Sequence, residues 1–153
     1  RTKDVLFGPY AFGEGKIKGL TALESRFGNL EAVCRSDNRL VHYWRDEYSG
    51  EWFQSEPFAE GVTGMPAFLE SSYGNFEVVT PLKEGGLGHW WRNNDDPMHP
   101  WFGPEVFGTE KYDEVILVEN DELHLTAIAC KDGKYQYYVR DDHNSWEWYG
   151  PYD

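Results

Sequence analysis

Three short segments of the sequence set aromatic side chains beside histidine and arginine: residues 40–45, 87–92 and 135–140. They read Leu-Val-His-Tyr-Trp-Arg, Leu-Gly-His-Trp-Trp-Arg and Tyr-Gln-Tyr-Tyr-Val-Arg. An aromatic ring next to a charged group can bind a sugar, because the ring packs on apolar C–H bonds while the charged group hydrogen-bonds to hydroxyls. Together with two glutamates at matched upstream positions, the candidate ligand-binding residues are Glu31, His42, Trp44, Arg45, Glu77, His89, Trp91, Arg92, Tyr138 and Arg140.

Catalytic and metal-binding chemistry finds less support in the sequence. The five histidines are scattered, and neither a His-x-x-x-His pair nor a Cys-x-x-Cys motif occurs, so we expect no metal site and no cofactor. No Gly-x-Ser-x-Gly motif is present, although a Ser-His-Asp triad needs no adjacency in the sequence. The acidic turns that follow residues 45, 92 and 140 would suit a glycosidase, but such turns are more commonly solvated. Repetition predicts equivalent binding sites and not one asymmetric catalytic centre, so we expect no enzyme.

The three segments recur at intervals of 47 and 48 residues, which identifies a repeat protein. Each interval holds four short runs separated by turn residues, and Gly-Asn at 28–29 and 74–75 is typical of hairpin turns. The fourth-run motif occurs once more at 5–12 and predicts an additional strand. The strands predicted for the units are 16–27, 30–35, 40–45 and 52–58, then 62–73, 76–81, 87–92 and 101–107, then 109–120, 123–130, 135–140 and 146–152.

Length and composition agree with one all-β repeat domain over residues 1–153. Aromatic residues make up 17% of the chain, glycines and prolines punctuate it, and no long stretch has apolar residues at helical spacing. We divide the domain into an extra outer strand within residues 1–15 and repeat units at 16–61, 62–108 and 109–153. Cys34 and Cys130 fall in the first and third units, where they either form a bridge or stay as free thiols.

The formal net charge of -13 disfavours partners that are themselves polyanions. A nucleic-acid duplex or an anionic membrane surface would be repelled, and no apolar run is long enough to span a bilayer. We therefore expect neither nucleic-acid binding nor membrane insertion.

Two architectures use four-stranded units of about this period: the blades of a β-propeller and the thirds of a β-trefoil. Three units match the trefoil number, which makes the trefoil the alternative. The up-and-down order of strands, the bulky aromatics in the third and fourth strands and the fourfold occurrence of the last motif favour propeller blades.

The motifs Gly-Asn-Leu-Glu-Ala-Val at 28–33, His-Tyr-Trp-Arg at 42–45 and Trp-Phe-Gly-Pro at 101–104 together resemble the blade repeat of bacterial and fungal β-propeller lectins of the PLL type. The resemblance covers nearly all the chain. The third unit departs from it, with Tyr137 and Val139 where the others have histidine and tryptophan. The resemblance implies sugar sites in shallow pockets between adjacent blades, with fucose as the sugar.

Three blades do not close a ring, because propellers have at least four. We therefore expect a homo-oligomer, with a dimer completing six blades, or a chain that is part of a longer propeller. The expected function is that of a secreted or extracellular multivalent lectin, in which several weak sites add up to high avidity for glycans. Two alternatives stay open: a structural or protein-interaction propeller whose aromatics are all core, and a glycan-active enzyme or toxin domain.

Overall fold

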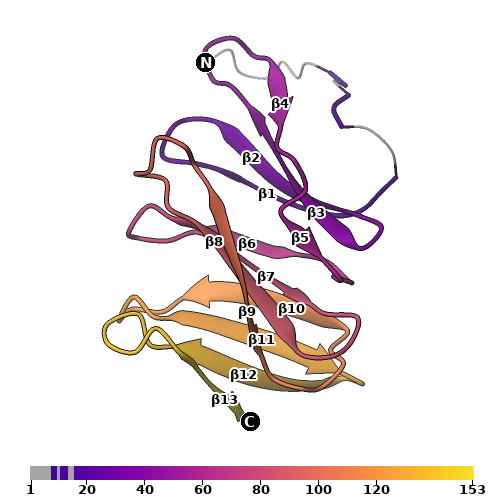
Figure 1. The fold of residues 1–153 in the computed structure, drawn as a ribbon, viewed down its shortest axis with the longest axis vertical. Coiled ribbons are helices and arrows are strands. Elements are labelled where there is room, and N and C mark those ends of the chain that lie inside the picture. Colours follow the sequence, from indigo (N-terminus) through magenta and orange to yellow (C-terminus); the bar gives the residue numbers. More distant parts are fainter. Residues whose placement is uncertain (1–7, 10, 14–15) are drawn as a thin grey trace.

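The computed structural model describes residues 8–9, 11–13 and 16–153, and every regular element among them is a β-strand. The strands form three antiparallel sheets that follow one another along the chain (Figure 1). Within each sheet, strands adjacent in sequence are adjacent in space, so each sheet is a meander. The first sheet holds β1 (Ile17–Glu24), β2 (Leu30–Ser36), β3 (Arg39–Arg45) and β4 (Trp52–Gln54), with the short β5 (Ala59–Glu60) also paired to β3.

The second sheet holds β6 (Ala67–Glu70), β7 (Phe76–Pro81), β8 (Leu87–Arg92) and β9 (Trp101–Phe107). The third holds β10 (Glu114–Glu119), β11 (Leu125–Lys131), β12 (Lys134–Arg140) and β13 (Trp148–Tyr152). In the part of the chain that the structure describes, no helix is long and apolar enough to cross a membrane.

The all-β prediction is confirmed, and the second and third strands of every unit lie within two residues of their predicted bounds. The first strands of the second and third units start later than predicted, because residues 62–66 and 109–113 carry the chain from one sheet to the next. The predicted strand 52–58 is split between β4 and β5. Pro57 has no N–H to donate there, and the Ser55 hydroxyl accepts the backbone N–H of His42 at 3.1 Å.

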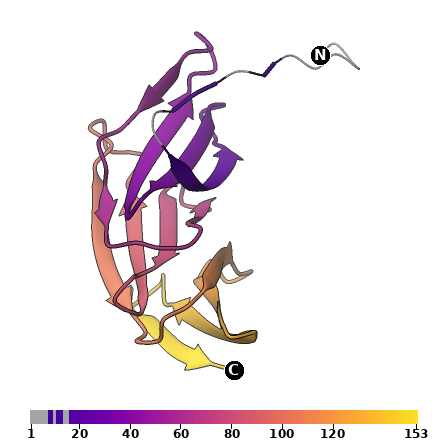
Figure 2. The ribbon, with the colours of Figure 1, turned by 90° about the vertical axis from the view of Figure 1, so that its right-hand side faces the viewer.

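The sheets pack face to face, and a hydrophobic core fills each of the two interfaces. Val33 and Leu40 of the first sheet meet Phe76 and Trp90 of the second. The second interface joins Val79 and Leu87 to Leu125 and Tyr138. β6 lies against β1, and β10 lies against β6 and β7. Figure 2 shows the sheets succeeding one another along a curve, with β9 and β13 at its outer side.

A stack of two aromatic rings recurs at the tryptophan that begins each fourth strand. Phe58 lies parallel to Trp101 with ring centroids 4.1 Å apart, and Phe107 lies parallel to Trp148 at the same distance. Each stack therefore links one sheet to the next. Phe12 stacks on Trp52 at 3.9 Å in the same way, although it precedes the first sheet.

Phe12 belongs to the segment for which an additional strand, 5–12, was expected. Residues 5–7 and 10 of that segment lie outside the described part of the chain. The described residues 8–9 and 11–12 have no strand geometry. What the segment contributes among the described residues is the ring of Phe12, which packs on Tyr43 and Trp52 of the first sheet.

A second link between sheets comes from a glutamate at the end of the first strand. The Glu70 carboxylate accepts the backbone N–H of Arg26 at 2.9 Å, and the Glu119 carboxylate accepts that of Ser72 at 3.0 Å. Arg26 and Ser72 occupy equivalent positions in the turns before β2 and β7. A charged acceptor thus fixes each turn against the following sheet, and that turn forms one edge of the interface.

We predict that Phe107→Ala lowers the free energy of unfolding by about 3–5 kcal/mol, because it removes a buried ring from both the Trp148 stack and the core. Val106→Ala on the same strand is the control, since Val106 is 57% exposed and its loss should change stability by less than about 0.5 kcal/mol. Urea unfolding of the two variants measures the difference. Equal midpoints would show that the stack does not hold the sheets together.

Candidate functional site

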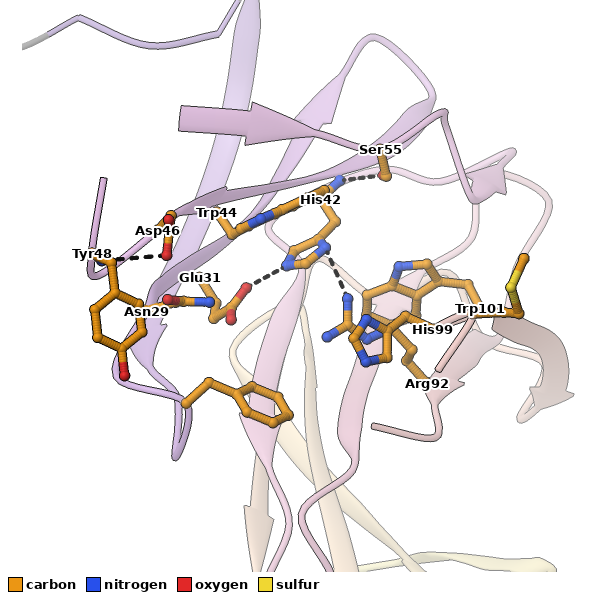
Figure 3. Close-up of a pocket in the computed structure, with 12 residues that line it drawn as sticks. Asn29, Glu31, His42, Trp44, Asp46, Tyr48, Ser55, Arg92, His99 and Trp101 are labelled. Atoms are coloured by element: carbon orange, nitrogen blue, oxygen red, sulfur yellow. Dashed lines mark hydrogen bonds and ion pairs between the residues drawn. The ribbon is translucent and has the colours of Figure 1, made fainter. Parts of the chain in front are cut away.

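A cavity of about 670 Å³ lies between the first and second sheets (Figure 3). Residues of β2 and β3 form one wall, among them Glu31, His42 and Trp44. Arg92 and Trp101 of the second sheet form the other. The turn before β2 and the long loop 93–100 supply the rim, through side chains such as Phe27 and His99.

A chain of three polar side chains crosses this interface: Glu31, His42 and Arg92. The Glu31 carboxylate lies 2.7 Å from Nε2 of His42, and its other oxygen accepts the Ser25 hydroxyl at 3.0 Å. Nδ1 of His42 lies 3.5 Å from Nη1 of Arg92. Burial lowers the pKa of His42 in spite of the Glu31 carboxylate, which acts to raise it. A neutral imidazole protonated at Nε2 satisfies both contacts, because it donates to Glu31 and accepts from Arg92.

Arg92 is only 7% exposed, and neighbouring groups hold its guanidinium from several sides. Its Nε donates to the side-chain oxygen of Asn94 at 2.6 Å, and the amide nitrogen of Asn94 donates to the Gly74 carbonyl at 2.9 Å. The guanidinium lies over the ring of Phe76, 4.5 Å from its centroid. Burial lowers the pKa of Arg92, and Glu31 opposes that effect. The guanidinium therefore keeps one fixed orientation toward the cavity.

Two tryptophans flank the polar chain. Trp44 stacks on the imidazole of His42 at 5.1 Å, and Trp101 meets the same imidazole edge-on at 5.7 Å. Both tryptophans line the cavity and are half-buried, so part of each ring faces its interior. The cavity thus combines aromatic walls with a guanidinium, an imidazole and a carboxylate.

A second copy of this constellation lies between the second and third sheets. Glu77 is 2.6 Å from Nε2 of His89, and the indole N–H of Trp148 donates to Nδ1 of that histidine at 3.4 Å. Arg140 takes the place of Arg92 and pairs with Asp142 at 3.3 Å. Burial raises the pKa of Asp142 to about 6, while Arg140 acts to lower it.

The grouping of residues differs from the one expected within single units. We predicted pairs of neighbours, Trp44 with Arg45 and Trp91 with Arg92. Successive side chains of a strand point to opposite faces of the sheet, so these neighbours face different interfaces. The structure instead brings Glu31, His42 and Trp44 together with Arg92 of the next sheet, and Glu77, His89 and Trp91 together with Arg140.

Arg45 and Tyr138 lie outside both constellations. Arg45 is exposed on the far face of the first sheet, where it lines a separate cavity with Phe12 and Trp52. Tyr138 is 2% exposed, and its hydroxyl lies 2.7 Å from that of Tyr112. Its ring therefore packs in the core between the second and third sheets and does not face a pocket. The third sheet has Thr126, Tyr137 and Val139 where the others have glutamate, histidine and tryptophan.

Several cavity residues were missed by sequence reasoning. Trp101 was assigned only to a strand motif, although the recurrence of Trp52, Trp101 and Trp148 at one register position was a usable signal. Asn29 was interpreted as a turn residue and His99 as one of several scattered histidines. Nothing in the local sequence places a loop histidine over a pocket of the preceding sheet.

Of the two alternatives for the cysteines, a bridge or free thiols, the described structure has free thiols: Cys34 and Cys130 are both buried and unpaired. Burial raises the pKa of Cys34 to about 11. Among the described residues, no group of three or more His, Cys, Asp or Glu side chains could hold a metal ion. Neither protein-family models nor curated protein sequences yield a match to this chain.

We predict that wild-type protein loses stability relative to His42→Gln as the pH falls below about 6.5. Because the pKa of folded His42 is lowered, the unfolded chain takes up the proton first, and protonation favours unfolding until the folded pKa is also passed. The difference in unfolding free energy between the two proteins should shrink by up to about 1.4 kcal/mol per pH unit.

Urea unfolding of both proteins between pH 7.5 and 5 measures this difference. The comparison with the variant is needed because Asp142 changes the stability with pH in the opposite direction. The raised pKa of its carboxyl makes its contribution to stability fall as the pH rises from about 4 to about 6. A difference that stays constant over the whole range would show that His42 is not kept neutral by burial.

Proposed function

We propose that this protein is a lectin of β-propeller architecture that binds glycans in pockets between neighbouring blades. The observation that carries the proposal is the composite cavity at the first interface. It sets two half-buried tryptophans beside a fixed arginine and a buried Glu–His pair. This is the combination that a sugar needs, namely aromatic surface for its C–H faces and oriented polar groups for its hydroxyls.

The propeller architecture is supported by the way the sheets repeat. Each is a separate four-stranded meander, and the same two links, the phenylalanine–tryptophan stack and the glutamate-to-turn hydrogen bond, join successive sheets. First strands contact one another while fourth strands lie at the outer side of the curve (Figure 2). Blades around a central axis have this arrangement. In the trefoil alternative the strands would instead contribute to one shared barrel.

A binding role fits the Glu31 carboxylate better than a catalytic one. Both of its oxygens are engaged, by Ser25 and by His42, and the side chain is 2% exposed. A glycosidase carboxylate has to reach the scissile bond or its attacking water. Glu31 instead orients His42, and through it Arg92, so we assign it a positioning role in a non-enzymatic site. Fucosylated glycans are the ligands that the resemblance to PLL-type lectins implies, and an extracellular location follows from such ligands.

The two outermost sheet faces support assembly into a larger ring. The far face of the third sheet exposes six large side chains, Ile116, Val118, Tyr135, Tyr137, Tyr149 and Tyr152. The equivalent faces of the first and second sheets are covered by the next sheet. On the far face of the first sheet, Leu20 and Leu30 are exposed, at 38% and 44%, beside the buried Ala32, Cys34 and Tyr43. We propose that a second copy joins head to tail at these faces, giving six blades and several sites.

We predict that Trp44→Ala and Arg92→Lys each weaken glycan binding at least about tenfold, because one removes an aromatic wall and the other the guanidinium fork. A glycan array followed by calorimetry with the best ligand provides the measurement. Val106→Ala, which shortens an exposed side chain outside the cavity and away from both end faces, is the matched control and should bind like the wild type. Unchanged binding by the Trp44→Ala/Arg92→Lys double variant would contradict the proposed site.

We predict that the protein in solution has twice the mass of one chain, and that the double variant Ile116→Glu/Tyr137→Glu has the mass of one. The two carboxylates would be buried without partners in the proposed contact. Sedimentation equilibrium measures the masses. Val106→Glu, at an exposed position away from both end faces, should leave the dimer intact. A wild-type protein that stays monomeric at every concentration would refute the ring.

A further inference from the structure

We propose that the cavity between the first and second sheets selects sugars that carry a carboxylate, through Arg92 and His99, and that the second copy of the constellation does not. This inference rests on the proposed function and names its ligand class. It is carried by four differences between the two copies, in the partner of the arginine, the residue opposite the histidine, the rings around the arginine and the loop residue at the rim.

The first two differences concern charge. Asn94 and Asp142 each stand two residues beyond their arginine and accept a hydrogen bond from it. Ser55 lies opposite His42 on the neighbouring segment, and Glu105 lies opposite His89. An amide and a hydroxyl in the first copy thus become two carboxylates in the second. The second copy already contains the anions that a ligand would bring.

These changes decide what surrounds the third nitrogen, Nη2, because Nε and Nη1 are hydrogen-bonded in both arginines. For Arg140, Nε donates to the Trp146 carbonyl at 3.2 Å, Nη1 donates to Asp142 at 3.3 Å and Nη2 lies 4.0 Å from Glu105. Arg92 donates from Nε to Asn94 and makes a long contact from Nη1 to His42. Among the described residues, Nη2 of Arg92 has no hydrogen-bond partner. Every buried side-chain polar atom of the described residues has a partner, so this unpartnered Nη2 keeps some exposure, and Arg92 lines the cavity.

The other two differences concern access. The Arg140 guanidinium lies over Trp91, at 5.7 Å, and over the loop residue Trp146, at 5.3 Å, whereas Arg92 lies over Phe76, at 4.5 Å, and Trp101, at 5.9 Å, with no indole from its loop. Trp146 stands two residues before the tryptophan of its fourth strand, as does His99 in the second sheet. Both have positive φ, 58° and 47°, a conformation that bulky residues rarely adopt. The strained position that covers Arg140 with an indole therefore holds, in the first copy, an exposed imidazole that lines the cavity near Arg92 (Figure 3).

An added carboxylate is the ligand group that Arg92 can still accept. Two carboxylates already line the cavity, but Ser25 and His42 engage both oxygens of Glu31, and the backbone N–H groups of Tyr48 and Ser49 engage both oxygens of Asp46. Glu31 acts to raise the pKa of Arg92, yet burial still lowers it. A planar carboxylate matches the geometry of a guanidinium fork, and the His99 imidazole at the rim can donate one more hydrogen bond. The sugar ring that carries the carboxylate would pack against Trp44 and Trp101. Uronic and sialic acids have this chemistry.

The net charge of -13 opposes acidic ligands only at long range. At physiological ionic strength the interaction of exposed charges is screened beyond about 8 Å, whereas a buried guanidinium acts at contact distance. Single acidic sugars at physiological salt are therefore the appropriate probes.

The experiment compares D-glucuronate with D-glucose, which differ only in a carboxylate for a hydroxymethyl group. Titration is followed by NMR of assigned tryptophan indole N–H signals. We expect glucuronate to bind at least about tenfold more tightly than glucose and to shift Trp44 and Trp101 but not Trp91 and Trp148. In Asn94→Asp, which places the counter-ion of the second copy in the first, the two sugars should bind equally. Asp142→Asn is the matched control and should keep the preference at the first cavity, with thermal melting confirming that both variants fold.

The outcomes separate this inference from the proposed function. Equal binding of the two sugars, or a preference that survives in Asn94→Asp, would overturn the carboxylate site while leaving the lectin in place. Acetate that binds as tightly as glucuronate would show that the sugar ring contributes nothing, and would overturn the inference as well. If a glycan array of neutral, fucosylated and acidic ligands gives no binding at all, the proposed function itself fails.

Discussion

The alternation of side chains along each third strand determines how the sheets fit together. On β3 and β8, the face that carries histidine and tryptophan looks toward the next sheet, and the opposite face looks back. The backward face of β8 places Trp90 in the first core, and that of β12 places Tyr138 in the second. Both glutamate–histidine–arginine constellations are therefore shared by two sheets, because no single strand can direct a tryptophan and the adjacent arginine into the same space. The candidate sites form only when the sheets are stacked.

This constraint explains how much of the fold and of the candidate site could be predicted from the sequence. The strands followed from turn residues and short apolar runs, since hairpins are local structures and their signals are local. The residue types of the site also followed, because recurrence singled out glutamate, histidine, tryptophan and arginine. The sequence did not indicate which arginine contacts which histidine. Arg92 reaches His42 across 50 residues of sequence, and that contact depends on how two finished sheets stack. Arg45 and Tyr138 were included on the same local grounds. Arg45 occupies the repeat position of Arg92 but faces away from the second sheet, and Tyr138 occupies that of the core residue Trp90.

The turns between the third and fourth strands differ among the three sheets, and the repeat pattern of the sequence did not reveal this difference. The turn between the third and fourth strands spans six residues in the first sheet, eight in the second and seven in the third. The position two residues before the fourth-strand tryptophan keeps positive φ in all three sheets, as Gly50, His99 and Trp146. A glycine there leaves the surface bare, a histidine adds a polar group and a tryptophan covers the arginine. One backbone conformation thus supports three different surfaces, and the residue at that position changes the surface beside the interface without changing the sheet.

The buried Glu31–His42 pair has a structural cost that packing alone does not explain. An apolar pair of similar volume would fill the same interface without desolvating a carboxylate, and such replacements are often neutral or stabilising. The pair persists in two copies, each with a glutamate–histidine distance of 2.6–2.7 Å. What it supplies is orientation. A neutral imidazole held by a carboxylate on one nitrogen presents a lone pair on the other, and that lone pair faces Arg92 in one copy and the Trp148 indole in the other. An apolar interface would hold the sheets together but would give Nη1 of Arg92 no acceptor, so the polar pair is best understood as a support of the proposed ligand surface.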